Sequence, residues 1–326
     1  MKSWNWKCGI AVSRVAYGCG DLGANWDPTP ILEEHYQRAA KALEAALEAG
    51  INFFDHADIY TYGKSETIFG RFLADHPGLR ERITLQSKCG IRAAGDSDPS
   101  APVRMDFSRQ HILTTVEGSL RRLGVERLDV LLLHRPDLLM EPQEVAEAFD
   151  ALSSRGQVRF FGLSNHTPAQ TALLRDTVRQ PLIVNQIELS LLATGLLDGQ
   201  IPGTKIAPVP PGAAGTLEDA RLHGMALQAW SPLARGHVLG DDRAREVHGP
   251  RAVALGKVLR EIASTRGVSR EALALAWVLR HPAGIQPIIG SMNPERIKDI
   301  CGAAEIELSR EEWYRLYVAG RGENMG

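Results

Sequence analysis

Four side chains that can hold or transfer protons end or follow three consecutive strand-like runs of the chain. Asp55 and Tyr60 come after the run INFF, Lys88 ends the run RITLQSK, and His134 follows the run LDVLLL. Taken singly, each has an ordinary explanation, as a turn cap, a packed ring, a solvated rim residue or a histidine satisfied beneath a loop. Their shared position at the ends of consecutive predicted strands favours one common site.

The four residue types make chemical sense together. A tyrosine has an ordinary pKa of about 10, which is too high for efficient proton donation near neutrality. A lysine ammonium group beside it lowers that pKa, and a carboxylate keeps the ammonium group charged and oriented. A histidine at the same place orients a carbonyl oxygen or relays the proton. Such a set protonates a developing alkoxide but holds no nucleophile, metal cage or redox centre, so it implies a hydride donor such as a nicotinamide cofactor.

The elements that position these residues alternate between apolar strands and amphipathic helices. Strands are expected at residues 15–19, 51–55, 82–88, 128–133, 158–163, 182–187, 226–230 and 285–289. Helices are expected at 34–49, 65–74 with Ser65 as N-cap, between Ser108 and Gly124, and at 142–154, 168–178, 216–223, 251–266, 270–280 and 294–302. Continuous apolar strands that alternate with helices indicate a parallel sheet covered by helices, and eight such units fit a closed (β/α)8 TIM barrel.

The competing arrangement is an open doubly wound sheet, whose mark is GxGxxG between its first strand and helix. The sequence GCGDLG has that glycine spacing, but a long stretch with two prolines separates it from the first helix. The barrel is therefore the better prediction. A short N-terminal β-hairpin, with one arm around 7–12, and an extra C-terminal helix at about 309–318 complete a single predicted domain over residues 1–326.

Composition limits the classes of partner. The chain has 326 residues, of which 44% are hydrophobic and 23% charged, and its net charge is −2. This balance gives no electrostatic reason to expect nucleic acid or an anionic membrane. No run approaches the length of a membrane span, and the N-terminus lacks the apolar segment of a signal peptide. Four scattered cysteines fit reduced thiols, and we expect a cytoplasmic protein without a metal site.

Several stretches together resemble the aldo-keto reductase family. They are GINFFDHADIY with SETIFG, SKCG, FSRQHILTTVEGSLRRLGVERLDVLLLHRPD, FGLSN, NQIELSLL, AWSPLARG and PIIGSMNPERI, and they cover roughly residues 15–300 in family order. The resemblance implies a (β/α)8 barrel that binds extended NADP(H) and reversibly reduces an aldehyde or ketone. It implies Tyr60 as general acid and base, with Lys88 and Asp55 tuning its pKa and His134 orienting the small-molecule carbonyl.

The same resemblance assigns the cofactor site. It places the nicotinamide carboxamide at Ser164, Asn165 and Gln186, and an aromatic ring against the nicotinamide at Trp230. It places the pyrophosphate at Ser231, Leu233, Arg235 and Gly236, and the adenosine 2′-phosphate at Ser291, Met292, Asn293 and Arg296. Gly290 stands where many members have a lysine, so 2′-phosphate recognition would depend on Arg296 and its neighbours. NADPH is the expected cofactor, with NADH the weaker candidate.

Four points stay open from the sequence alone: the roles of Trp26 and His56, the alternative functions and the oligomeric state. Trp26 either stacks on a substrate or closes the barrel mouth, and the sequence does not decide between the two. His56 is unusual for the family, and we expect its ring to make a supporting hydrogen bond. A cofactor-binding regulatory or redox-sensor subunit with little turnover is the alternative function. A metal-dependent hydrolase using His56, Asp58 and His134 is less favoured, because no HxH pair lies on a strand. The oligomeric state is not indicated.

Overall fold

Eight parallel strands close into a barrel, as the alternating pattern predicts. The computed structural model describes residues 3–96, 98–199 and 214–323. The barrel strands are β3 (Ala16–Gly18), β4 (Phe53–Asp55), β5 (Thr84–Cys89), β8 (Leu128–Leu133), β9 (Val158–Ser164), β10 (Leu182–Glu188), β11 (Ala226–Trp230) and β12 (Ile285–Ile289). Their order around the barrel follows the chain, and β12 pairs with β3 to close it. The C-terminal ends of all eight strands therefore face one mouth.

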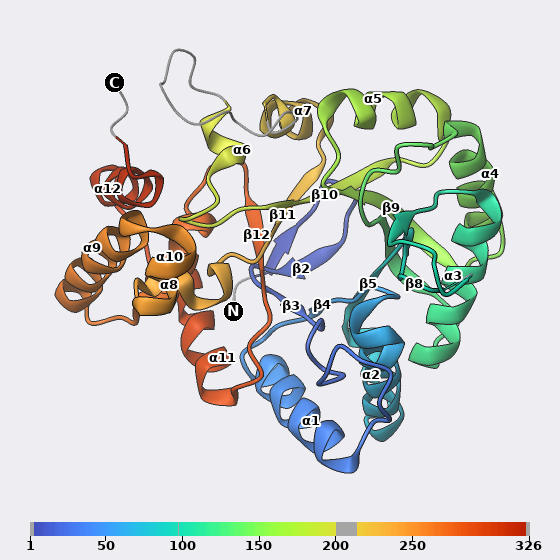
Figure 1. The fold of residues 1–326 in the computed structure, drawn as a ribbon, viewed down its shortest axis with the longest axis horizontal. Helices are drawn as coiled ribbons and strands as arrows, with labels where there is room; N and C mark the ends of the chain where they lie inside the picture. The colour runs from blue at the N-terminus through green and yellow to red at the C-terminus, as the bar shows by residue number, and fades with distance from the viewer. Residues whose placement is uncertain (1–2, 97, 200–213, 324–326) are drawn as a thin grey trace.

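Helices surround this barrel, as Figure 1 shows. They are α1 (Glu33–Glu48), α2 (Lys64–Asp75), α3 (Arg109–Leu123), α4 (Pro142–Ser154), α5 (Pro168–Thr177), α6 (Gly195–Asp198), α7 (Thr216–His223), α8 (Asp242–His248), α9 (Pro250–Arg266), α10 (Arg270–Leu279), α11 (Pro294–Cys301) and α12 (Arg310–Arg321). The predicted extra C-terminal helix is α12, which lies against α9. Within the described residues, no helix is both long enough and apolar enough to span a membrane.

Local sequence signals explain the ends of α3. The Ser108 hydroxyl accepts a hydrogen bond from the backbone N–H of His111, and Gly124 ends the helix with a left-handed φ of 64°. The expected start of α2 was wrong, because α2 begins at Lys64 after Gly63 rather than at an N-cap on Ser65. Ser65 is already helical, and its backbone N–H is satisfied by the Thr61 hydroxyl at 3.1 Å.

A two-stranded hairpin closes the end of the barrel opposite the mouth, where the strands begin. Its arms are β1 (Ser3–Asn5) and β2 (Ala11–Ser13), which pair in antiparallel register. The predicted arm around 7–12 is therefore displaced, since residues 6–10 form the connection between the arms. Buried apolar side chains of the hairpin, Trp6 among them, pack with Phe53 and other residues near the starts of the barrel strands.

The alternation of side chains along each strand determines which residues face the barrel interior above the hairpin. Phe53 belongs to the cluster inside the barrel, and Phe54 belongs to the larger cluster between barrel and helices. Because alternate side chains share a face, Asp55 points inward above Phe53. The same rule places Gln86 and Lys88 on one face of β5. Asp55 and Lys88 at the mouth thus rest on barrel strands rather than on loops.

The connecting segments hold more structure than the sequence indicates. A two-stranded ribbon, β6 (Ile91–Arg92) and β7 (Arg104–Met105), lies between β5 and α3, where no strand was expected. Helix α8 occupies part of the segment 237–250, and α6 occupies part of 190–216. Most of the Pro- and Gly-rich segment 202–215 lies outside the described residues.

Candidate active site

Lys88 bonds to two of the other predicted residues, Asp55 and Tyr60, and the three form one buried cluster at the mouth. Its ammonium group donates hydrogen bonds to Asp55 Oδ2 at 2.7 Å, to the Tyr60 hydroxyl oxygen at 2.9 Å and to the backbone carbonyl of His56 at 2.8 Å. The side chains of Asp55 and Lys88 expose 3% and 0% of their surface. The three donors of the ammonium group are therefore all used, and an ion pair sits where water is largely excluded.

The fourth predicted residue, His134, lies against the ring of Tyr60. The two ring centres are 5.9 Å apart and the planes are nearly perpendicular, at 82°. The Nδ1 atom of His134 is buried and has no hydrogen-bond partner. The side-chain amide of Asn165 donates to the His134 backbone carbonyl at 3.3 Å, which ties the end of β8 to the end of β9. We call Asp55, Tyr60, Lys88 and His134 the tetrad.

Burial dominates the electrostatics of the tetrad. It raises the pKa of Tyr60 above 10, while the Lys88 charge and hydrogen bond oppose that rise. Burial alone would lower the pKa of Lys88, but the charges of Asp55 and Tyr60 raise it on balance. Burial, with help from Lys88 and Arg135, holds the pKa of His134 well below 6.5. Lys88 is thus charged, His134 is neutral, and the predicted lowering of the Tyr60 pKa is only one of two opposed effects.

An unusual backbone turn brings Tyr60 into the cluster. Tyr60–Gly63 form a 3-10 turn in which Thr61 and Tyr62 have left-handed φ values of 48° and 60°. Such backbone is strained for residues other than glycine and is maintained only when its surroundings hold it. Here the buried Thr61 hydroxyl bonds to Ser65 Oγ at 2.8 Å. The turn directs Tyr60 inward and leaves Tyr62 58% exposed, so the two tyrosines are clearly distinguished.

A second buried polar group lies behind the tetrad. Glu66 is fully buried and is held by Arg122 at 2.7 Å and by the Ser87 hydroxyl at 2.7 Å. Burial and the Glu66 charge raise the pKa of Asp58 to about 7, and Asp58 Oδ1 has no hydrogen-bond partner. This carboxyl group therefore changes protonation near neutral pH.

His56 does not make the hydrogen bond expected of it. Both ring nitrogens are buried without a partner, and the ring meets Phe69 edge-on at 4.6 Å. Burial lowers the pKa of His56 to about 3, with Lys88 acting in the same direction, so the ring stays neutral. The contribution of His56 to the site is its backbone carbonyl, which accepts from Lys88.

The residues assigned to the nicotinamide end form a connected row beside the tetrad. Trp230 donates its indole N–H to Asn165 Oδ1 at 2.9 Å, and the Asn165 amide donates to Ser164 Oγ at 2.9 Å. Asn165 has a left-handed φ of 62°, a conformation that asparagine tolerates better than most residues. The Gln186 amide is buried lower in the barrel and donates to Asp55 Oδ1 at 3.2 Å. The row holds the Trp230 ring in one orientation.

The loop after β11 has the backbone of an anion-binding turn. Ser231, Ala234 and Arg235 have φ values of 50°, 46° and 56°, and Gly236 follows at 92°. Successive left-handed residues can form a concave anion-binding turn, and here the N–H groups of Ala234 and Gly236 donate to the Ser231 and Leu233 carbonyls at 2.8 Å each. Arg235 is exposed on this loop, and Leu233 packs against the main core. This arrangement fits a pyrophosphate.

The segment after β12 leads into the N-terminus of α11. Asn293 caps that helix by accepting from the backbone N–H of Arg296, and Ser291 Oγ accepts from the N–H of Asn293. Tyr17 donates to the Ser291 carbonyl at 3.0 Å and contacts the Met292 sulfur, which fixes the segment to β3. Arg296 is exposed at the first turn of the helix. A helix N-terminus with an arginine beside it fits a phosphate group.

Trp26 lies at the mouth of the barrel. Its ring centre is 6.1 Å from that of Tyr60, with the planes at 72°, and 53% of the residue is exposed. The side chain therefore borders the tetrad and also faces solvent. This position suits contact with a ligand at the Tyr60 hydroxyl.

The sequence interpretation missed three buried glutamines beneath the tetrad, on β5, β11 and β12. Gln86 donates to Asp55 Oδ1 at 2.6 Å and to Gln228 Oε1 at 2.9 Å, and Gln228 donates to Gln286. A signal was present, since Gln86 precedes Lys88 and Gln228 precedes Trp230 by two residues. Strand alternation places such pairs on the same face.

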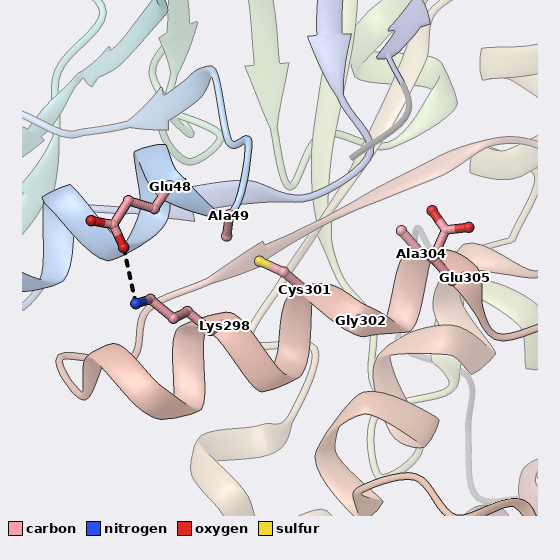
Figure 2. Close-up of a pocket in the computed structure, with 7 residues that line it drawn as sticks. All are labelled: Glu48, Ala49, Lys298, Cys301, Gly302, Ala304 and Glu305. Atoms are coloured by element: carbon pink, nitrogen blue, oxygen red, sulfur yellow. Dashed lines mark ion pairs between the residues drawn. The ribbon is translucent and has the colours of Figure 1, made fainter.

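Other polar places on the molecule do not compete with this site. A hollow of about 450 Å3 lies between α1 and α11, at the end of the barrel where strands begin (Figure 2). Its Lys298 and Glu48 are paired at 2.9 Å, and burial raises the pKa of Cys301 to about 11. In the part of the chain that the structure describes, no three His, Cys, Asp or Glu side chains are grouped as metal ligands would be.

The chain is similar to known proteins in both sequence and fold. Residues 14–318 match the model of the aldo/keto reductase family. The chain is 37% identical to a 6-dehydroglucose reductase of Agrobacterium fabrum, with 97% of each chain covered. It superposes on the glycerol dehydrogenase of Gluconobacter oxydans with a TM-score of 0.80, at 27% identity and over 99% and 96% of the two chains. An aldo-keto reductase of Klebsiella pneumoniae in complex with NADPH gives a TM-score of 0.75, at 25% identity and over 99% and 96%.

Proposed function

The chain belongs to the aldo/keto reductase family of oxidoreductases, and we propose that it reversibly transfers a hydride between NADPH and an aldehyde or ketone at the tetrad. The observation that carries the proposal is the position of Lys88. One buried ammonium group is bonded at once to Asp55 and to the Tyr60 hydroxyl. That contact puts a fixed positive charge beside the phenol that would supply the proton.

The direction of the Lys88 hydrogen bond assigns the acid. Because Lys88 donates to the Tyr60 oxygen, the hydroxyl hydrogen of Tyr60 is free to point into the mouth. In reduction, Tyr60 donates this hydrogen to the developing alkoxide, and Lys88 stabilises the phenolate that remains. In oxidation, the phenolate takes the proton back. Asp55 holds the ammonium group in place during both steps.

His134 serves as the neutral partner of Tyr60. Its low pKa keeps the ring uncharged, so a ring N–H can hydrogen-bond to a carbonyl oxygen without adding a charge. Since Nδ1 is buried without a partner, Nε2 is the nitrogen that we assign to the substrate. Two donors, from Tyr60 and His134, would then fix the carbonyl oxygen.

The cofactor site is proposed along one arc of the mouth. When bound, NADPH supplies the hydride. Ser164 and Asn165 would hold the nicotinamide carboxamide, with Gln186 close by, and the oriented ring of Trp230 would stack on the nicotinamide. The left-handed loop with Leu233, Arg235 and Gly236 would cradle the pyrophosphate. Ser291, Met292, Asn293 and Arg296 would take the 2′-phosphate, since the α11 N-terminus and the Arg296 guanidinium both favour an anion.

The similarity to a 6-dehydroglucose reductase suggests the substrates to test first. At 37% identity over nearly the whole chain, a hydroxylated aldehyde is a reasonable substrate class for this protein. Trp26 borders the Tyr60 hydroxyl and would stack on the apolar face of such a molecule.

The proposal is tested by following the hydride. Purified protein is incubated with NADPH carrying deuterium at the 4R or the 4S position and with a panel of aldehydes, including hydroxylated ones. Mass spectrometry should detect deuterium in the alcohol product from only one of the two labelled cofactors. Absence of labelled product from both cofactors across the panel, for a folded protein that binds NADPH, would contradict the proposed reaction.

A further inference from the structure

A layer of buried amide side chains crosses the barrel directly beneath the tetrad. Gln86, Gln186, Gln228 and Gln286 lie on β5, β10, β11 and β12, and each is at most 2% exposed. In the closed strand order β5 lies opposite β11, and β4 lies opposite β10. Bonds between these strands therefore span the interior. Branched apolar residues usually fill such an interior, so this polar layer requires an explanation.

Two of the amides share the same pair of acceptors. Gln86 Nε2 donates to Asp55 Oδ1 at 2.6 Å and to Gln228 Oε1 at 2.9 Å. Gln186 Nε2 donates to the same two oxygens at 3.2 Å and 3.1 Å. Asp55 Oδ1 is thus held by two amide donors, which leaves Oδ2 for Lys88 at 2.7 Å. The carboxylate has one fixed orientation as a result.

The hydrogen-bond network fixes the direction of every amide in the layer. Gln286 donates to the backbone carbonyl of Ser13 at 2.7 Å, and Gln228 donates to Gln286 Oε1 at 2.9 Å. The Asp55 carboxylate and the Ser13 carbonyl can only accept, so the amides between them have one consistent arrangement. In that arrangement Gln86 presents N–H, not oxygen, to Asp55.

Donating both N–H groups in this way leaves the side-chain oxygen of Gln86 without a hydrogen bond. Its Oε1 is buried and has no hydrogen-bond partner. A polar network that only stabilises the fold is expected to satisfy its members, and a buried unsatisfied acceptor is unfavourable. Both Nε2 hydrogens are used while the oxygen is left without a bond, which indicates that the contact with Asp55 takes precedence.

We propose that Gln86 is a positioning residue, oriented by Gln228, that holds the Asp55 carboxylate turned toward Lys88. The carboxylate in turn holds the Lys88 ammonium group beside Tyr60. The inference rests on the proposed function, because it assigns Gln86 a role in the same proton transfer.

The test is Gln86→Met, which replaces the amide by an unbranched apolar side chain. The initial rate of NADPH oxidation is measured with an accepted aldehyde. We expect kcat to fall about tenfold while KM for NADPH changes less than about threefold, because the carboxylate that orients Lys88 loses one of its two amide donors and the cofactor loops are untouched.

Gln286→Met is the matched control, since it makes the same change in the same layer but meets Asp55 only through Gln228. Gln228 Oε1 keeps both of its donors in that variant, so kcat should stay within about twofold of the unmodified enzyme. Equal losses of kcat in both variants would assign the layer a general structural role and overturn the proposal.

Gln228→Met provides a second route if Gln86→Met does not fold. It leaves Gln86 in place and removes the oxygen that orients its amide, so kcat should fall by a smaller factor, again with KM for NADPH changed less than about threefold. An unchanged kcat in the folded variant would refute the proposal. Failure of the proposed function is distinguishable, because in that case the unmodified enzyme does not turn over or Tyr60→Phe retains full activity.

Discussion

Replacing Asp58 with asparagine should stabilise the protein above pH 7 and have a progressively smaller effect as the pH falls. The pKa of Asp58 rises from 3.8 to about 7 on folding, mainly because of burial and the nearby Glu66. A carboxyl group of this kind binds more protons in the native than in the unfolded protein. Stability therefore falls as the pH rises between the two pKa values and levels off above pH 7.

The size of the effect follows from the same two values. A shift from 3.8 to about 7 costs about 4 kcal/mol of unfolding free energy at pH 8, and roughly 2 kcal/mol at pH 5. Asparagine is close in size and carries no charge, so Asp58→Asn removes this cost. The stability gain over the unmodified protein should therefore be about 2–3 kcal/mol larger at pH 8 than at pH 5.

Urea unfolding followed by tryptophan fluorescence at the two pH values measures the gain. Asp176→Asn, on an exposed position of α5, is the control and should show no comparable pH dependence. A gain for Asp58→Asn that is equal at pH 5 and pH 8 would show that Asp58 does not titrate between them. The assigned burial and charge effects would then be wrong.

Three further predictions concern the ion pair, the cofactor and the packing. Lys88→Met should lower unfolding stability by about 3–5 kcal/mol in urea titrations, because it leaves the buried Asp55 carboxylate without its cation. Steady-state assays should show its kcat reduced far more than its NADPH affinity, and unchanged kcat would refute the Lys88 role. Arg296→Ala should raise KM for NADPH about tenfold or more and leave KM for NADH nearly unchanged; equal changes for both cofactors would remove Arg296 from the 2′-phosphate site. Gly70→Ala should cost about 1–3 kcal/mol in thermal or urea unfolding, because its Cβ would lie 2.3 Å from the Arg122 carbonyl oxygen where α2 packs on α3. A melting temperature equal to that of the unmodified protein would contradict this contact.

The sequence predicts the barrel well, because each element carries its own signals. The run Leu128–Leu133 is apolar except for Asp129, and β8 has those bounds. Ser108 and Gly124 give chemical start and stop signals for α3, which the structure confirms. The meeting of Asp55 with Lys88 also follows from sequence, since parallel strands in a barrel end at the same mouth.

The features that sequence missed depend on contacts between distant strands. Gln86 reaches Gln228 across the barrel interior, and no local pattern specifies such a bond. The same limit applies to the indole of Trp230, which bonds to Asn165 in the segment after β9. His56 was expected to form a hydrogen bond, but its ring packs on Phe69 instead. The opposing influences on the Tyr60 pKa likewise required the burial of the site to be known.

Tyr60→Phe compared with Tyr62→Phe tests the central claim most directly. Both variants remove one hydroxyl group from the same turn, but the Tyr60 hydroxyl bonds to Lys88 whereas Tyr62 is 58% exposed. With NADPH and an accepted aldehyde, Tyr60→Phe should lose at least about 100-fold in kcat while still binding NADPH, and Tyr62→Phe should stay within about twofold of the unmodified enzyme. Full turnover by Tyr60→Phe would contradict the assignment of Tyr60 as the proton donor.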